Sequence, residues 1–342
     1  MGRNLHKNQT EQLSIDDAIE RVNPFIIDVR APMEYAAGNI PGSVNLPLLD
    51  DQERHLIGIL YKQDGPEAAV DQGYKYLEPK ENELARALDS FPTDRPWAVL
   101  CARGGMRSRV MTSFINHLGS PAVQLTGGYK AYRTFCLNQF ETQSYPNLVV
   151  LHGQTGVGKT LVIQRLTNSL DLEGIANHRG SMFGGVGLKP RSQKNFEGLL
   201  TKRLRELDWG KPVFVEGESR KIGQVSIPPA LFTAMGDARN VLLEAPLALR
   251  SERTRVEYID QQPECADQIR ELVSRLYLDL GHARVGQLLE WFDSAQYDRC
   301  FGAILSEYYD LKYNHTLKKL KFESVLDTSN VTQTVQALES LN

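Results

Sequence analysis

Cys101 is the residue whose surroundings in the sequence most favour chemistry. It follows a short apolar run, 97–100, and precedes the segment Ala-Arg-Gly-Gly-Met-Arg-Ser, after which helical periodicity begins. Glycines let such a loop turn several backbone N–H groups inward, and a helix N-terminus adds positive potential, so the thiolate is favoured. A free cysteine is more often buried and inert. The neighbours that favour the reactive interpretation are Arg103, Gly104, Gly105, Arg107 and Arg109.

A second loop has the pattern of a phosphate-binding site. Residues 153–160 (GQTGVGKT) fit G-x-x-x-x-G-K-[ST] in full, between an apolar strand candidate and an apolar-periodic helix, 161–166. Backbone N–H groups in such a loop bind phosphate oxygens, Lys159 supplies a point charge, and Thr160 is a candidate magnesium ligand. The pattern predicts a ligand that carries a diphosphate and does not require a nucleotide. The glycines of this loop are Gly153, Gly156 and Gly158.

Charged residues downstream of the phosphate loop are further candidates. Glu216 and Glu218 follow an apolar run, where P-loop proteins place an acidic residue; they are either metal or water partners or solvated charges at a strand end. No Asn-Lys-x-Asp motif follows, which argues against a GTPase. Cations mixed with aromatic or imidazole rings suit RNA, although one such stretch alone is more often a solvated helix face. The candidate RNA or diphosphate contacts are His178, Arg179, Ser181 and Arg220, with a further basic stretch at 312–321.

Alternating strands and helices are needed to position these loops. The apolar runs that predict buried parallel strands are 25–29, 97–100, 123–125, 148–151, 213–215, 241–243 and 324–326. Helical patterns at 81–88 and 107–118 lie between them. We therefore predict an N-terminal α/β domain over residues 12–140 and a second α/β domain over 146–342. A long helical pattern at 263–311 predicts that the C-terminal part of the second domain is helical.

Composition narrows the class of protein. The 342 residues, 41% hydrophobic and 24% charged, suit two globular domains, and the net charge of -3 is neutral evidence about nucleic acid. No apolar run approaches the roughly 18 residues that span a bilayer, and residues 1–11 lack the apolar core of a signal peptide. The four cysteines have scattered spacings, which predict a reducing, cytoplasmic setting. We interpret Cys136, Cys265 and Cys300 as structural.

The Cys101 loop resembles the active-site loop of rhodanese domains, and the resemblance extends beyond the loop. The segments 28–30 (DVR), 34–35 (EY) and 38–45 (GNIPGSVN) are similar to the rhodanese pattern, with Asn39 in place of its usual histidine. Gly127-Gly128-Tyr129 resembles the closing motif of that domain. The resemblance implies a rhodanese-like fold in which Cys101 carries a chalcogen as a covalent intermediate.

The order of the two motifs narrows the resemblance to one family. A rhodanese-like domain followed at once by a P-loop domain resembles the tRNA 2-selenouridine synthases, from about residue 16 to about residue 328. Segments outside the general motifs that agree are 53–63, 101–108, 177–181 and 215–220. The resemblance implies that 2-thiouridine at the wobble position (U34) of tRNA is S-geranylated from geranyl diphosphate. Selenium from selenophosphate then converts it to 2-selenouridine.

That reaction implies roles for the residues in both loops. Lys159 and Thr160 would bind the diphosphate of the prenyl donor, and Cys101 would carry selenium as a perselenide stabilised by loop amides and Arg107. S-alkylation helps because a C=S sulfur is a poor leaving group, whereas an alkylated sulfur leaves as a thiol. We expect no tightly bound cofactor and no membrane contact, with magnesium a candidate ion. The expected partners are tRNA and a selenophosphate synthetase that supplies selenophosphate.

Two other functions fit the motifs. The first is a rhodanese-type sulfurtransferase fused to an ATP-dependent kinase-like module that acts on a small molecule; it predicts rapid ATP turnover without tRNA. The second is a regulatory protein in which a nucleotide gates the P-loop domain and the rhodanese-like domain only docks. It predicts a chemically idle Cys101, and the intact loop argues against it.

Overall fold

The structure, a computed structural model, describes residues 10–341 and divides into two units. The first comprises the described residues up to Thr142 together with Glu197–Thr201, and the second comprises the others. Residues 1–9 and residue 342 lie outside the described part. The expectation that the first residues do not form a signal peptide falls mostly on residues 1–9. Across residues 10–341, no helix is both long and apolar enough to cross a bilayer.

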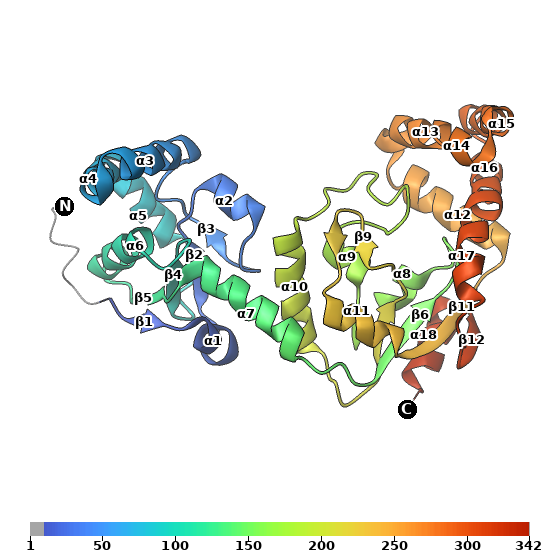
Figure 1. The fold of residues 1–342 in the computed structure, drawn as a ribbon, viewed down its shortest axis with the longest axis horizontal. Coiled ribbons are helices and arrows are strands. Elements are labelled where there is room, and N and C mark those ends of the chain that lie inside the picture. The colour runs from blue at the N-terminus through green and yellow to red at the C-terminus, as the bar shows by residue number, and fades with distance from the viewer. Residues whose placement is uncertain (1–9, 342) are drawn as a thin grey trace. The chain divides into compact units, whose positions relative to one another are not determined.

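The first unit is built on a five-stranded parallel sheet (Figure 1). Its strands lie in the order β1 (Gln12–Leu13), β5 (Ala122–Leu125), β4 (Trp97–Leu100), β2 (Phe25–Asp28) and β3 (Val44–Asn45). Every residue of β2 and β4 is buried, which explains why both sequences are apolar except for Asp28, whose carboxylate pairs with Arg30. The central strand β4 ends immediately before Cys101, so the sheet holds that residue at its carboxyl edge.

Helices flank this sheet and include the two that the sequence predicted. They are α1 (Ile15–Asp17), η2 (Ala18–Val22), α2 (Pro32–Ala37), α3 (Asp51–Gln63), α4 (Gly65–Leu77), η3 (Glu78–Lys80), α5 (Glu81–Asp89), α6 (Met106–His117) and α7 (Gly128–Thr142). Helix α6 begins at the end of the cysteine loop and buries Val110, Met111 and Phe114 in the core. The hairpin of α3 and α4 was not predicted; Asp50 begins α3 by accepting the N–H of Glu53 at 2.8 Å.

The second unit contains another five-stranded parallel sheet. Its strands lie in the order β12 (Ser324–Asp327), β11 (Arg239–Glu244), β6 (Leu148–His152), β8 (Val213–Glu216) and β7 (Ser169–Leu170), and a separate antiparallel pair joins β9 (Lys221–Ile222) to β10 (Val225–Ser226). The four longer strands match predicted runs. The two-residue strands were not predicted, because two residues carry no periodicity. Strand β6 is central and leads directly into the phosphate loop.

The helices of the second unit are shorter than the sequence patterns indicated. They are α8 (Lys159–Ile163), α9 (Leu172–Ala176), α10 (Gln193–Glu206), α11 (Pro229–Gly236), α12 (Leu247–Arg255), η4 (Val256–Asp260), η5 (Pro263–Cys265), α13 (Ala266–Ser274), α14 (Tyr277–Leu280), α15 (His282–Asp293), α16 (Tyr297–Ile304), η6 (Leu305–Tyr309), α17 (Asp310–Leu317) and α18 (Val331–Glu339). The helix predicted to reach Leu166 ends at Ile163, although Leu166 is still buried. Gly281 and Ala295 have φ values of 80° and 58°, which cannot continue a right-handed helix, so the 263–311 pattern is divided there.

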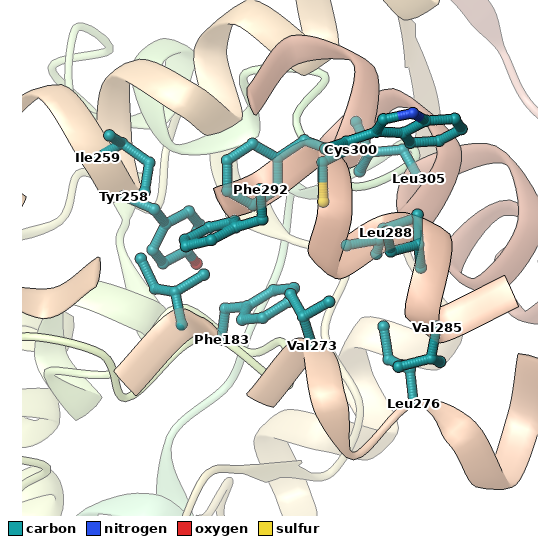
Figure 2. Close-up of a cluster of buried hydrophobic side chains, with 14 of the residues drawn as sticks. Phe183, Tyr258, Ile259, Val273, Leu276, Val285, Leu288, Phe292, Cys300 and Leu305 are labelled. Atoms are coloured by element: carbon teal, nitrogen blue, oxygen red, sulfur yellow. The ribbon is translucent and has the colours of Figure 1, made fainter. Parts of the chain in front are cut away.

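The helical part of the second unit, orange to red in Figure 1, has its own apolar core, shown in Figure 2. Phe183 reaches this core from the glycine-rich segment 178–185, and its ring centroid lies 5.9 Å from that of Tyr258. Cys300 is fully buried here, and burial raises the pKa of its thiol to about 12. Burial also raises the pKa of Cys136. Both thiols therefore fit the structural interpretation made from the sequence.

Candidate functional site

Cys101 lies at the carboxyl end of β4, and its side chain is almost completely buried. Its Sγ accepts the N–H of Gly105 at 3.2 Å and lies 3.2 Å from the hydroxyl oxygen of Ser108 in the first turn of α6. Burial opposes ionisation of the thiol. The Ser108 hydroxyl and the backbone N–H groups of Ser108, Arg103 and Gly105 outweigh burial, so the pKa of Cys101 is lowered. The loop therefore stabilises a thiolate.

Ser108 is held in place by a buried amide on the neighbouring strand. Gln124 in β5 donates from Nε2 to the Ser108 oxygen at 2.8 Å and to the carbonyl of Gly104 at 2.9 Å. Because the Ser108 oxygen accepts from Gln124, its own hydrogen can be donated to the Cys101 sulfur or to the Gly105 carbonyl oxygen, each 3.2 Å away. The sequence analysis assigned no role to Ser108 or Gln124. The position of Ser108 inside the loop could have indicated its role, but that of Gln124 depends on strand pairing.

The Gly-Gly-Tyr segment 127–129 closes the cysteine loop. Gly104 has a φ of 63°, and a Cβ there would come within 2.7 Å of the Gly127 nitrogen. The N–H of Tyr129 donates to the carbonyl oxygen of Cys101 at 2.9 Å. The guanidinium carbon of Arg30 lies 3.8 Å from the centre of the Tyr129 ring, and Arg30 forms a buried ion pair with Asp28. The segments that resemble rhodanese domains thus meet around one loop.

The arginines near Cys101 act less directly than the sequence suggested. Arg107 forms an ion pair with Glu34, with one nitrogen 2.6 Å from Oε2 and the other 3.3 Å from Oε1. Burial opposes ionisation of Glu34, but the ion pair with Arg107 outweighs burial, so the pKa of Glu34 is lowered. In turn, Glu34 and then the Cys101 thiolate favour the charged form of Arg107. Arg103 is exposed, and no hydrogen bond or ion pair found among residues 10–341 joins Arg103 or Arg109 to the Cys101 sulfur. The N–H groups and a hydroxyl contact the sulfur directly, and Arg107 interacts with it through its charge; a contribution of Arg103 and Arg109 to the positive potential stays a prediction.

The phosphate loop follows β6 and adopts the backbone that its glycines allow. Gly156 and Gly158 have φ values of 78° and 95°. A Cβ at Gly158 would lie 2.9 Å from a guanidinium nitrogen of Arg253, so a larger residue would be strained and crowded. Lys159 folds over the loop and donates from Nζ to the carbonyl of Gly153 at 3.0 Å. The ammonium group is thus held at the loop by a bond that a phosphate oxygen can replace.

Two arginines of α12 support the phosphate loop. Arg250 is buried; it donates to the carbonyl of Thr155 at 2.9 Å and pairs with Asp310 at 2.6 Å. Arg253 donates to the carbonyl of Val157 at 2.6 Å. The sequence analysis missed both arginines. Their partners lie far away in the sequence, so no local pattern indicates that they position the loop.

A cavity of about 610 Å³ opens beside the phosphate loop. Its walls bring together most of the candidates in this unit, namely Lys159, Thr160, His178, Arg179, Ser181 and Glu218. Tyr313 also lines it, with its ring centroid 5.9 Å from Lys159 Nζ. Arg220 is exposed and is not part of these walls. The structure therefore separates Arg220 from the other predicted contacts.

The basic residues in the cavity wall have partners within the protein. Arg179 pairs with Glu257 at 2.6 Å and lies 5.1 Å from the centre of the Tyr258 ring. Nδ1 of His178 accepts the N–H of Gly180 at 3.1 Å. Burial, and then the charge of Arg179, lower the pKa of His178, which favours the neutral ring. These two side chains shape the 178–185 segment as well as lining the cavity.

Three glutamates with raised pKa values lie at or beneath this cavity. Burial, and then the charge of Glu218, raise the pKa of Glu173 to about 8, while Thr160 donates to its Oε2 at 3.1 Å. Burial also raises the pKa of Glu218. Glu216 is completely buried; burial and neighbouring carboxylates raise its pKa well above the ordinary value, and one oxygen accepts the N–H of Leu172 at 2.8 Å. The alternative that Glu216 is a solvated strand-end charge is therefore wrong. Glu173 was missed.

The side chains beside the phosphate loop offer few donors for a metal ion. Within the described part of the chain, no three His, Cys, Asp or Glu side chains are grouped as metal ligands. Beside the phosphate loop, the Thr160 hydroxyl and Glu173 Oε2 lie together, 3.1 Å apart. Mg²⁺ prefers oxygen ligands and commonly binds through few protein groups plus substrate phosphates and water. Thr160 and Glu173 fit that pattern only for an ion that arrives with a diphosphate.

The sequence matches two family models in chain order. Residues 11–134 match the rhodanese-like domain. Residues 146–341, more than half of the chain, match the AAA domain of tRNA 2-selenouridine synthase. The chain belongs to the tRNA 2-selenouridine synthase family. The cysteine loop lies in the first matched region, and the phosphate loop with its cavity lies in the second.

Proteins named tRNA 2-selenouridine synthase align with both regions. The one from Hydrogenovibrio crunogenus is 36% identical over 335 residues, which cover 89% of this chain and 92% of that protein. The one from Nitrosomonas europaea is 40% identical over 263 residues, covering 73% and 68%. The one from Sulfurovum sp. is 34% identical over 328 residues, covering 87% and 90%. Similarity to tRNA 2-selenouridine synthases therefore extends over both units.

Proposed function

We propose that this chain is a cytoplasmic transferase that converts 2-thiouridine at the wobble position of tRNA to 2-selenouridine. One observation carries the proposal: a member of this family combines a cysteine loop that lowers a thiol pKa with a phosphate loop beside a cavity. A reaction that releases a diphosphate in one step and uses an anionic selenium donor in another needs two anion-binding loops. This chain has one in each unit.

The phosphate loop is assigned to geranylation. The sulfur of 2-thiouridine attacks C1 of geranyl diphosphate, the C1–O bond breaks, diphosphate leaves, and the N3 proton of the base passes to solvent. Negative charge develops on the leaving diphosphate. Loop N–H groups and Lys159 stabilise it, and Thr160 would hold a Mg²⁺ ion that entered with the substrate and would supply further positive charge. The role assigned to Lys159 is supported by its position on the loop, where its Nζ donates to the carbonyl oxygen of Gly153.

The cysteine loop is assigned to selenation. Selenium attacks C2 of the S-geranyl base, the C2–S bond breaks, and geranyl thiol leaves; with selenophosphate from a selenophosphate synthetase, phosphate is the other product. Overall no electrons are gained or lost. Selenium in a Cys101 perselenide is two electrons more oxidised than in selenophosphate, so loading needs a two-electron acceptor, which we assign to a small-molecule disulfide that is reduced to two thiols. After the outer selenium has attacked C2, those two thiols cleave the S–Se bond, release 2-selenouridine and the Cys101 thiol, and re-form the disulfide. The N–H groups of the loop suit such an anion on Cys101.

Nucleoside mass analysis tests both assignments. Wild-type protein, tRNA with 2-thiouridine, geranyl diphosphate and selenophosphate should give the S-geranyl and then the seleno nucleoside. Cys101→Ser should stop at the S-geranyl product. Lys159→Ala should lower geranylation by about 10²–10³-fold, the usual effect of losing one donor to developing charge. It should still form selenouridine from RNA that is supplied already S-geranylated.

Three results would contradict the proposal. Selenouridine from Cys101→Ser at the wild-type rate would remove the role of Cys101. Unchanged geranylation by Lys159→Ala would remove that of the phosphate loop. Rapid ATP hydrolysis without tRNA, with neither nucleoside product, would favour the sulfurtransferase–kinase alternative.

A further inference from the structure

A large apolar cavity lies in the first unit. Its volume is about 630 Å³, within the range of small-molecule sites, and it is bounded by α3, α4, the segment before α3 and the first turn of α6. Most of its wall is aliphatic or aromatic carbon. The apolar wall includes Leu48, Ile57, Ile59, Val70, Tyr74 and Val110.

Helix α3 has no buried residue, although much of its sequence is apolar. Ile59 and Tyr61, which line the cavity, are 37% and 61% exposed, and Met106 across from them on α6 is 40% exposed. Single exposed apolar side chains are common, but several grouped around a cavity are typical of a binding site. The wall therefore has apolar surface that no described residue of this unit covers.

The cavity adjoins the loop that holds Cys101. Met106 and Arg107 line it and follow Gly105 directly, whose N–H binds the Cys101 sulfur. Arg54 and Lys62 add positive charge to its wall. An apolar chain in the cavity would thus lie beside the Cys101 loop, with cations available for phosphates of the attached RNA.

We propose that this cavity binds the geranyl chain of the S-geranyl-2-thiouridine intermediate while selenium is transferred. The inference rests on the proposed function. A nucleobase would leave its polar edge atoms without partners against these aliphatic walls, which is costly, whereas a branched hydrocarbon chain loses nothing by burial there. Held in this way, the geranyl group directs the C2–S bond toward the Cys101 loop. The cavity then makes the alkylated nucleotide, and not 2-thiouridine, the substrate for selenation.

Competition between two S-alkylated substrates tests this assignment. The full chain is given selenophosphate and a synthetic anticodon stem-loop that carries either S-geranyl- or S-methyl-2-thiouridine. Both bases release a thiol, so the difference in kcat/KM between them measures recognition of the chain. Wild-type protein should favour the S-geranyl substrate by at least about tenfold, since even one methylene in an apolar pocket is worth that much.

Two variants of α3 locate the recognition. Ile59→Glu places a charge in the cavity wall, and Leu56→Glu is the matched control, because Leu56 is exposed on the same helix but outside this cavity. Ile59→Glu should lower the ratio of kcat/KM for the S-geranyl substrate to that for the S-methyl substrate about tenfold or more. Leu56→Glu should keep the preference. Both sites are exposed, so both variants should fold.

The outcomes separate this inference from the proposed function. A geranyl preference that survives Ile59→Glu, or falls equally in Leu56→Glu, would overturn the cavity assignment. Equal use of both substrates by the wild type would overturn it too, while selenation itself stands. Failure of the wild type to selenate either substrate would refute the proposed function, and the inference with it.

Discussion

The two loops of this protein have the same local architecture and opposite electrostatics. Each follows the central strand of a parallel sheet, turns through glycines with positive φ, and leads into a helix. At the cysteine loop the nearby acid, Glu34, pairs with Arg107, and the pKa values of Glu34 and Cys101 are both lowered. At the phosphate loop the acids Glu173, Glu216 and Glu218 all have raised pKa values.

The difference follows from what each loop holds. The cysteine loop contains its own anion, the Cys101 thiolate, and its N–H groups are already bonded to it. The phosphate loop has no covalent anion, and Lys159 bonds a backbone carbonyl while the glutamates crowd together. The cysteine loop is therefore organised before its substrate arrives. The glutamates near the phosphate loop keep protons that a rise in pH can remove. Each prediction below tests one side of this contrast.

Glu216→Gln should make the fold less sensitive to pH. The raised pKa of the buried Glu216 means that the folded state keeps a proton which the unfolded state releases above the ordinary carboxyl pKa. Stability is therefore lost as pH rises through the interval from that ordinary value to the raised one, by up to about 1.4 kcal/mol per pH unit. Over two pH units the variant should gain about 2–3 kcal/mol relative to wild type, measured by urea unfolding.

Glu244→Gln is the matched control, because Glu244 is an exposed glutamate at the end of another strand of the same sheet. If the free energies of unfolding of Glu216→Gln and wild type stay parallel at every pH above the ordinary carboxyl pKa, Glu216 does not hold a proton in the folded state. The group of glutamates with raised pKa values near the phosphate loop would then lose its most buried member.

Ser108→Ala should weaken the thiolate at the other loop. It removes the hydroxyl 3.2 Å from the Cys101 sulfur, and a hydrogen bond to a charged group is worth about 1.5–3 kcal/mol. The pKa of Cys101 should rise by about one unit, so its alkylation at pH 7 should slow about tenfold. Peptide-resolved iodoacetamide labelling across pH measures this. Thr112→Ala, which removes a buried hydroxyl on the same helix, should leave the rate unchanged; an equal effect would mean that α6 was merely disturbed.

The strands that carry both loops could be predicted because buried parallel strands are continuous apolar runs. Residues 97–100 are predicted and observed as one strand, and residues 148–151 differ by one residue. The helix after the phosphate loop was predicted too long. Its apolar spacing continues to Leu166, but the chain turns toward β7 after Ile163, and Leu166 is buried without being helical. Burial produces the same spacing in a coil as in a helix, so periodicity alone could not locate the end.

The site was predictable where residues adjacent in sequence act together. Cys101, Lys159 and Thr160 lie in loops whose glycines indicate their backbone. Gln124 and Arg250 were missed because they reach the loops through strand pairing and helix packing. The acid cluster shows the same limit. Glu216 has its strand-end position in common with solvated glutamates, and only the packing of α9 over it makes it buried.

Glu173→Gln should remove the pH dependence of diphosphate binding. Glu173, with a pKa of about 8, and Glu218 titrate as a coupled pair beside Lys159. Below that pH the pair keeps a proton; above it an added negative charge repels a diphosphate. Between pH 7 and 9 the wild-type affinity for inorganic pyrophosphate should fall about threefold to tenfold, since a unit charge a few ångströms away in solvent is worth ~1 kcal/mol.

Calorimetry with the full chain measures this, and the ligand's own titration cancels when variant and wild type are compared. Glu252→Gln, which changes another glutamate of the cavity wall, should keep the wild-type pH dependence. If Glu173→Gln binds pyrophosphate with the same pH profile as wild type, protons on the acid pair do not control the phosphate loop. That loop would then be as fixed in charge as the cysteine loop, and the contrast between them would reduce to the covalent anion at Cys101.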